Sequence, residues 1–292
     1  MVRIVCLFCC ICFFCACEKE TELEIPNSHE DIVANCLLQA NKPFDVYVGK
    51  TLHELDTGEL YINNAIVCVT TCSTKEADTL IYTANGHFKS ERGKVWVEGE
   101  SYSLSINYNN KHAVAMATVP TTVKFDNYSI SNTFLGRDGF DTRTITITFT
   151  DAAETDNYYM LLLSWCSTDT LPFQGYVKNY EWYSYSPAIV SEGDEYTDLF
   201  SDVLFNGQTI SIPMNFHFWN YNRFYDLKYR VKCYLVTVEK SYYEYCKSLR
   251  LSRESENDIW QTNAVPQIKS NIENGFGVFS GINISDSIIV IL

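Results

Sequence analysis

The chain has 292 residues and a formal net charge of −14, with 36 acidic against 22 basic side chains. This length suits one large or two small domains. Nucleic acid is not expected as a partner, because phosphate binding requires a basic surface and the charge here is negative.

The chain opens with MVRIVCLFCCICFFCAC, in which Arg3 is the one charged residue. The apolar run at 4–16 is too short to span a bilayer, which takes roughly 20 residues. It has the length of the hydrophobic core of a signal peptide, about 7–15 residues. Its cysteines lie among Phe, Ile and Leu without polar support, so we interpret them as small apolar residues and not as metal ligands.

The leader ends in FCAC (14–17), which resembles a bacterial lipobox with Phe14 where Leu is usual. In such signals the final cysteine, here Cys17, is lipidated and becomes the first residue of the mature protein. We therefore expect a lipoprotein signal peptide at 1–16 and a lipidated tether at 17–24 that anchors the chain in a membrane. An ordinary cleaved signal and a membrane anchor are the alternatives.

The residues after Cys17 read EKETE (18–22). A charged run of this kind is a solvated tether on the simplest interpretation. It also resembles the acidic export signal that sends lipoproteins of Bacteroidota to the outer face of the outer membrane. We expect a protein that is lipid-anchored in the outer membrane and faces the cell exterior, and a periplasm-facing anchor is the alternative.

The remainder of the chain is dominated by strand signals. Alternating or β-branched runs separated by turn clusters lie at 32–38, 44–48, 65–71, 101–107, 113–119, 144–150, 158–165, 209–213, 229–238 and 287–292. The run TITITFT at 144–150 places Ile145, Ile147 and Phe149 on one face of a strand. Many short strands at this spacing predict a mainly β protein of two β-sandwich (immunoglobulin-like) domains, at 25–120 and 121–292. The second has one short helix and long loops.

Six cysteines lie in these predicted elements, at positions 36, 68, 72, 166, 233 and 246. An exported chain is free to form disulfides, and the sequence leaves open whether any forms. Cys68 and Cys72 would not bridge within one straight strand, because four residues span about 13 Å. Zinc binding is not expected, because no second pair of ligands lies nearby.

Catalytic patterns are largely missing from the sequence. HELDT at 53–57 begins like a zinc protease helix, but Thr57 stands where a second His is required. There is no Gly-x-Ser-x-Gly elbow, and the five histidines are scattered. We expect no enzyme activity, no cofactor and no metal.

Two aromatic-rich segments, 173–187 and 216–229, are the strongest binding signal. Exposed aromatic side chains bury large areas at little entropic cost and carry polar edges. The alternative is aromatic pairing across strands within a sheet. The candidate ligand-binding residues are Tyr180, Trp182, Tyr183, Tyr185, Trp219 and Tyr221.

Five carboxylates cluster between these segments, at Glu192, Asp194, Glu195, Asp198 and Asp202. Several oxygen ligands would suit calcium, but the spacing of an EF-hand is missing, so a solvated loop is favoured. A hydrolase that uses these carboxylates is a further alternative.

A helix is predicted near residue 241, where Ser241 and Glu244 have the spacing of a capping box. Its apolar face is expected to lie on a sheet and consists of Tyr242, Tyr245, Cys246 and Leu249. The later segment SNIENGFGVFSG at 270–281 is not a phosphate loop, because no lysine follows the glycines. We expect a tight turn at Asn274-Gly275, and close backbone approach at Gly277 and Gly281.

Several phrases in chain order are similar to one family. They are ELEIP, IVANCLL, INNAIVCV, YSLSI, ATVP, FTDAAETDNYYMLLL, FSDVLFNGQTISI, VEKSYYEYCKSL and SNIENGFGVFSG. Together they resemble the Bacteroidota lipoproteins classed as domain of unknown function 4249, from which the chain departs in its extra cysteines. The resemblance implies an outer-membrane lipoprotein of β-sandwich build, of a kind commonly encoded beside TonB-dependent transporters, and it supplies no catalytic residues.

These observations predict a surface-exposed, non-enzymatic lipoprotein that binds a ligand or serves as the accessory subunit of a TonB-dependent nutrient transporter. Its partners would be the outer membrane, through the lipid on Cys17, and the transporter. An adhesin or structural assembly subunit is the main alternative.

Overall fold

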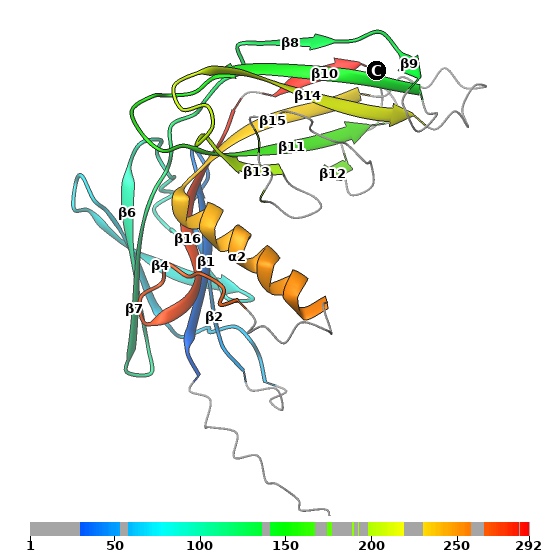
Figure 1. The fold of residues 1–292 in the computed structure, drawn as a ribbon. Coiled ribbons are helices and arrows are strands. Elements are labelled where there is room, and N and C mark those ends of the chain that lie inside the picture. Colours follow the sequence, from blue (N-terminus) through cyan, green and yellow to red (C-terminus); the bar gives the residue numbers. More distant parts are fainter. Residues whose placement is uncertain are drawn as a thin grey trace, which may run out of the picture.

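The computed structural model describes residues 30–52, 58–135, 141–166, 174–176, 189, 192, 198–218, 230–257, 266–285 and 287–291. In this part the protein is mainly β, and its strands form two β-sandwiches, one above the other in Figure 1. None of its helical segments has both the length and the apolar character that a membrane crossing requires. Cys17 lies outside the described residues, so its lipidation stays a prediction.

Strands of the first half build the lower sandwich. They are β1 (Ile32–Gln39), β2 (Asp45–Lys50), β3 (Ile66–Thr71), β4 (Ala77–Ala84), β5 (His87–Lys89), β6 (Ser101–Tyr108) and β7 (Lys111–Thr118). The strands β3, β6 and β7 pair as antiparallel neighbours, and β2 lies between β1 and β5.

The upper sandwich follows residue 120. Its strands are β8 (Asn127–Ile130), β9 (Phe134–Leu135), β10 (Asp141–Thr150), β11 (Tyr158–Cys166), β12 (Gln174–Tyr176), β13 (Asp198–Ser201), β14 (Thr209–Phe218), β15 (Arg230–Val238) and β17 (Ile288–Ile291). One sheet has the order β14-β10-β8, and the other contains β12, β11 and β15. The helix α2 (Lys240–Asn257) and the strand β16 (Gly275–Ile284) complete the described fold.

The core of the lower sandwich is filled by alternate residues of its strands, as the pleat requires. Along β6, Tyr102, Leu104 and Ile106 are buried, while the residues between them face outwards. The ring of Phe44 stacks on Trp96 with 3.9 Å between ring centroids. Loop aromatics thereby close one end of this core.

The predicted alternation at 144–150 is confirmed. Ile145, Ile147 and Phe149 of β10 are fully buried, and they pack against β11 and β15 across the upper sandwich. The threonines between them face outwards, where Thr148 and Thr150 meet hydroxyl groups of β14.

The strand β16 belongs to both sandwiches. It runs parallel to β1 from the pair Ile32–Gly275 to the pair Gln39–Ile282, and its last residues pair with β15. Its Phe279 lies in the lower core. The expected boundary at residue 120 lies between the strands of the two sandwiches, except that β16, which comes after it, adds a parallel partner to β1 and the side chain of Phe279 to the lower core.

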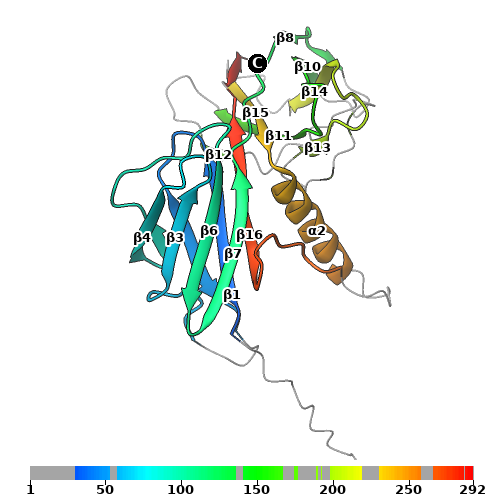
Figure 2. The same ribbon diagram turned by 90° about the vertical axis from the view of Figure 1, so that its left-hand side faces the viewer.

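Glycines let β16 approach its neighbours, as expected for this segment. A Cβ on Gly281 would lie 1.8 Å from the carbonyl oxygen of Thr118 in β7, and Figure 2 shows these two strands side by side. Gly277 has φ +106°, and a Cβ there would lie 2.1 Å from the Ala34 carbonyl oxygen. Asn274 makes the predicted turn with φ 57°.

The predicted helix is α2, but its start differs from the prediction. It begins at Lys240 and has 18 residues, so it is not short. The capping box is wrong, because Ser241 lies inside the helix and its hydroxyl pairs with Ser280 Oγ at 2.6 Å. The helix packs on the outer side of β11 and β15 mainly through Tyr243, with Tyr242 and Cys246 beside it.

Cys36, Cys68, Cys72, Cys233 and Cys246 form no disulfide in the structure. Cys36, Cys68, Cys72 and Cys233 are free thiols. Cys68 lies in the strand β3 and Cys72 directly follows it. This is the extended arrangement in which four residues hold the two cysteines too far apart to form a bridge. Burial raises the pKa of the Cys36 thiol and also raises the pKa of Cys233 to about 12, so both act as small apolar core residues.

Candidate ligand groove

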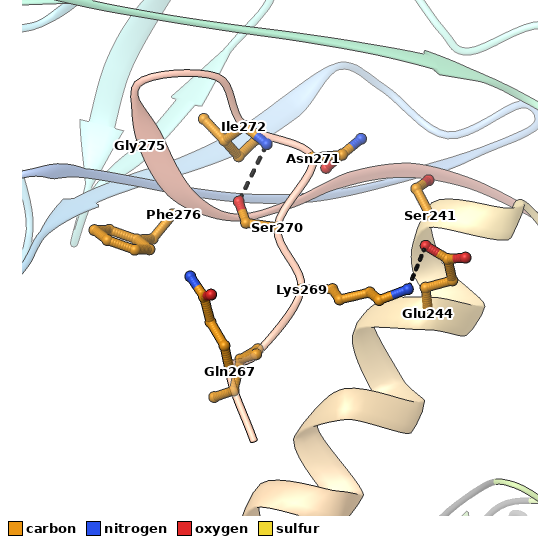
Figure 3. A pocket seen from close by; sticks show the side chains of 10 residues that line it. Ser241, Glu244, Gln267, Lys269, Ser270, Asn271, Ile272, Gly275 and Phe276 are labelled. Atoms are coloured by element: carbon orange, nitrogen blue, oxygen red, sulfur yellow. Dashed lines mark hydrogen bonds and ion pairs between the residues drawn. The ribbon is translucent and has the colours of Figure 1, made fainter. Parts of the chain in front are cut away.

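A groove of about 720 Å³ lies where α2 faces the start of β16. Figure 3 shows its walls, with the helix on one side and the strand on the other, and the segment 267–272 running between them. It is lined by Ser241, Glu244, Gln267, Ile268, Lys269, Ser270, Asn271, Ile272, Gly275 and Phe276. This volume is typical of sites for small ligands, which occupy roughly 300–1,000 Å³.

The segment 267–272 forms the floor of the groove and is fixed at two points by side-chain hydrogen bonds. The amide of Asn271 accepts from Phe279 N at 3.0 Å and donates to Phe279 O at 2.6 Å, so it acts like one residue of a neighbouring strand. On the helix side, Lys269 N donates to Ser248 Oγ at 2.8 Å. The floor of the groove is therefore preorganised.

The two charged side chains of the groove neutralise each other. Lys269 Nζ lies 3.2 Å from Glu244 Oε2, and this ion pair spans the space between the floor and the helix (Figure 3). Both side chains are partly exposed, so the pair adds little stability. It does remove the net charge that would attract an ion.

Two apolar side chains of the groove remain open to solvent. Phe276 is 45% exposed and Ile268 is 40% exposed. Phe276 is the register partner of Val33 on β1, which places its ring on the outer face of the lower sandwich. The sequence argument considered only the glycines of this segment and missed Phe276. A signal was present, because Phe276 lies between two glycines that bring β16 close to β1, so its ring has no room in the core and faces outwards.

A partly buried carboxylate, that of Glu239, lies between the two sandwiches next to Ser280. Glu239 Oε1 accepts from Thr118 N at 3.1 Å, and Oε2 accepts from Gly281 N at 2.9 Å and Ser280 Oγ at 3.1 Å. Its backbone carbonyl also accepts from Tyr242 N at the start of the helix. Burial raises the pKa of Glu239 above its ordinary value, against the lowering effect of these donors.

The residues chosen from the sequence lie elsewhere. Tyr180, Trp182, Tyr183, Tyr185, Trp219 and Tyr221 all fall outside the described residues, so their role in binding stays a prediction.

The described members of the carboxylate cluster have structural partners. Glu192 pairs with Lys247 of α2 at 2.6 Å. Asp202 accepts from Asn157 N at 2.8 Å, and burial raises its pKa. In the described ranges, no group of three or more His, Cys, Asp or Glu side chains is arranged to hold a metal. Asp194 and Glu195 lie outside those ranges.

One Cys-His-Asp combination comes together near β1, but its geometry does not suit a nucleophile. His87 Nδ1 lies 2.8 Å from Asp45 Oδ1. The thiol of Cys36 points into the core and donates to the backbone oxygen of Asp45 at 3.2 Å. The hydrogen bond of this thiol thus goes to the backbone of Asp45, and burial also raises the pKa of the thiol, so the arrangement does not favour a thiolate.

Comparison with known proteins gives a family and no function. A family model described as "Domain of unknown function (DUF4249)" matches residues 18–288. No curated protein matches the chain. Among solved structures, the full-length major pilin SpaD from Corynebacterium diphtheriae is 9% identical, with 90% of this chain and 67% of that chain covered and a TM-score of 0.21. A score this low does not establish a common fold.

Proposed function

Since the chain belongs to the DUF4249 family, we propose that it is a lipid-anchored, surface-exposed binding protein that serves a TonB-dependent nutrient transporter and has no enzyme activity of its own. The groove between α2 and β16 carries the proposal, because it combines a preorganised polar floor with exposed apolar side chains. The leader ending at Cys17 and the acidic run behind it support the location in the outer membrane.

The length of the proposed tether limits how far the sandwiches can lie from the membrane. A segment of the length of residues 17–29 spans at most about 43–47 Å when fully extended, at roughly 3.3–3.6 Å per residue. A lipid on Cys17 would therefore keep the folded part close to other proteins of the same membrane and would leave it free to turn. Local concentration of this kind makes a weak docking contact effective.

The test is capture of the intact protein from native outer membranes after gentle detergent extraction, followed by mass spectrometry. A TonB-dependent transporter at near-equal amount supports the proposal. The control is a Cys17→Ser variant, which should lose both the membrane anchor and the transporter. Recovery of the protein with no transporter in either sample would contradict the accessory role.

A structural assembly subunit is the second candidate, and the strand β8 favours it. This strand lies at the end of the sheet order β14-β10-β8, and all four of its residues are exposed. Tyr128 and Ile130 face the same side as their buried partners Ile147 and Ile145, yet they are 44% and 40% exposed. Edges of this kind accept further strands.

Self-association distinguishes this candidate. Sedimentation of the purified chain should show oligomers that a Tyr128→Lys, Ile130→Lys double variant abolishes, because charge on an edge strand prevents pairing. A protein that stays monomeric at every concentration tested would exclude assembly through β8.

A further inference from the structure

We propose that the groove between α2 and β16 binds a neutral oligosaccharide, with the ring of Phe276 as the surface on which a sugar lies. This inference rests on the proposed binding function and names the class of ligand. It comes from three features of the groove: its charge, its hydrogen-bonding groups and its shape.

The charges of the groove give an ionic ligand no advantage. The carboxylate of Glu244 and the ammonium group of Lys269 are 3.2 Å apart and satisfy each other. An anionic ligand would have to separate this pair to reach the lysine, and a cationic ligand would have to do so to reach the glutamate. The groove therefore offers no unpaired charge, which favours a neutral ligand.

The remaining polar groups of the lining are hydroxyl and amide groups. They belong to Ser241, Gln267, Ser270 and Asn271, and each has both donors and acceptors. Both amide hydrogens of Asn271 are used, on Phe279 O at 2.6 Å and on Met116 O at 3.3 Å, and its Oδ1 accepts from Phe279 N, so Asn271 is fixed in place and keeps one lone pair for a ligand. The Gln267 amide and the Ser270 hydroxyl add donors, and this mixture suits a ligand rich in hydroxyl groups.

The apolar part of the lining is one aromatic ring and one aliphatic side chain. Phe276 and Ile268 are both about half exposed, and Figure 3 shows Phe276 apart from the ion pair, on the strand side of the groove. A sugar ring has a face of C–H groups between edges of hydroxyl groups. It would cover the aromatic ring with this face and keep its edges toward the floor.

A peptide fits the groove less well. Addition of a strand requires a free sheet edge, but both backbone groups of Phe279 bond to Asn271. The neighbouring edge of β7 is occupied as well, because Val114 exchanges two hydrogen bonds with Glu273. A bound helix would need a broad apolar stripe, and this groove exposes two apolar side chains.

The test is isothermal titration of the mature lipidated chain in detergent micelles with neutral hexasaccharides of glucose, xylose, mannose and galactose. Hexagalacturonate and a capped apolar hexapeptide are the comparison ligands. We expect at least one neutral sugar to bind, and Phe276→Ala to weaken it by about 10-fold or more. The matched control is Phe134→Ala, since Phe134 is 44% exposed on β9 and should not affect the affinity.

A second variant tests the role of charge. Glu244→Gln leaves the ammonium group of Lys269 without its carboxylate, so this variant should bind hexagalacturonate at least about 3-fold more tightly than the wild type does. Binding of the galacturonate or the peptide in preference to every neutral sugar would overturn the inference, as would sugar binding that Phe276→Ala leaves intact or no sugar binding at millimolar concentration. If the transporter is still captured in that case, the accessory role stands and only the ligand class fails.

Discussion

Glu239 is a partly buried glutamate that links the two sandwiches. Glu239 is held by donors from β7 and β16, and its own backbone starts α2. Burial nevertheless outweighs these donors and raises its pKa. The folded protein therefore holds a proton here at pH values where the unfolded chain, with a glutamate pKa of about 4.3, has lost it.

A pH dependence follows from that shift. Stability linked to Glu239 is fully present below the unfolded pKa and is lost as the pH rises through the raised folded pKa. We expect the difference in unfolding free energy between wild type and Glu239→Gln to fall as the pH rises from about 4 to about 8. Urea unfolding of both proteins measures it, and all other titrating groups cancel in the difference. A difference that is constant or grows with pH would refute this assignment.

Tyr159 and Asp151 form a buried hydrogen-bonded pair in the upper sandwich. Tyr159 donates its hydroxyl to Asp151, which also accepts from Gly207 N at 2.8 Å. Burial and this carboxylate raise the pKa of Tyr159 far above its ordinary value, so the hydroxyl remains a donor throughout the physiological range. The bond closes the loop before β11 against the turn before β14.

Removing that hydroxyl should be costly. In Tyr159→Phe the buried carboxylate of Asp151 loses one of its partners, so we expect the unfolding free energy to fall by about 1–3 kcal/mol. The control is Tyr128→Phe, whose side chain is 44% exposed and whose change should stay within about 0.5 kcal/mol. Equal stability of the two variants would show that Asp151 does not depend on the tyrosine.

At the scale of elements, β16 depends on glycines where it crosses β7. Gly281 has no room for a side chain, because a Cβ would lie 1.8 Å from a backbone oxygen of Thr118, and its N–H holds Glu239. We expect Gly281→Ala to lower the unfolding free energy by about 3 kcal/mol, at the upper end of overpacking effects. Gly58→Ala, with no neighbour nearer than 4.0 Å, is the control. Equal melting midpoints for the two variants would contradict the close crossing.

Elements defined by local patterns could be predicted from the sequence. The strand β10 was predictable because its buried residues Ile145, Ile147 and Phe149 follow the period of the pleat. The existence of α2 was predictable too. Its cap was not, because the hydroxyl of Ser241 bonds to Ser280, which no local spacing reveals.

The features that could not be predicted depend on pairing between segments far apart in the sequence. Val278 N bonds to the Asn35 side chain across 243 positions of sequence, and no pattern within either segment specifies the other as its partner. The groove could not be predicted for the same reason, because its lining joins α2 with the segment before β16 and with β16 itself. The aromatic residues chosen from the sequence lie outside the described residues, and the lining of the groove includes none of them.

At the scale of the whole molecule, the two sandwiches are tied together at one junction. The strand β16 pairs with β1 below and with β15 above. Beside it, Glu98 accepts from Thr122 N at 2.9 Å, and Asn283 Nδ2 donates to Pro120 O at 3.0 Å. The groove lies between α2, which packs on the upper sandwich, and the start of β16, which pairs with β1 of the lower sandwich, so its shape depends on both sandwiches remaining in place.

Folding of the first sandwich should therefore require the end of the chain. A fragment of residues 30–120 lacks the parallel partner of β1 and also lacks Ile272 and Phe279, which lie in its core. Loss of these buried side chains costs several kcal/mol, comparable with the whole stability of a small domain. We expect this fragment alone to show no cooperative thermal transition by circular dichroism, and a fragment with residues 266–284 joined through a flexible linker to regain one. A sharp transition in the fragment that ends at 120 would show instead that the sandwich folds alone and that β16 is added afterwards.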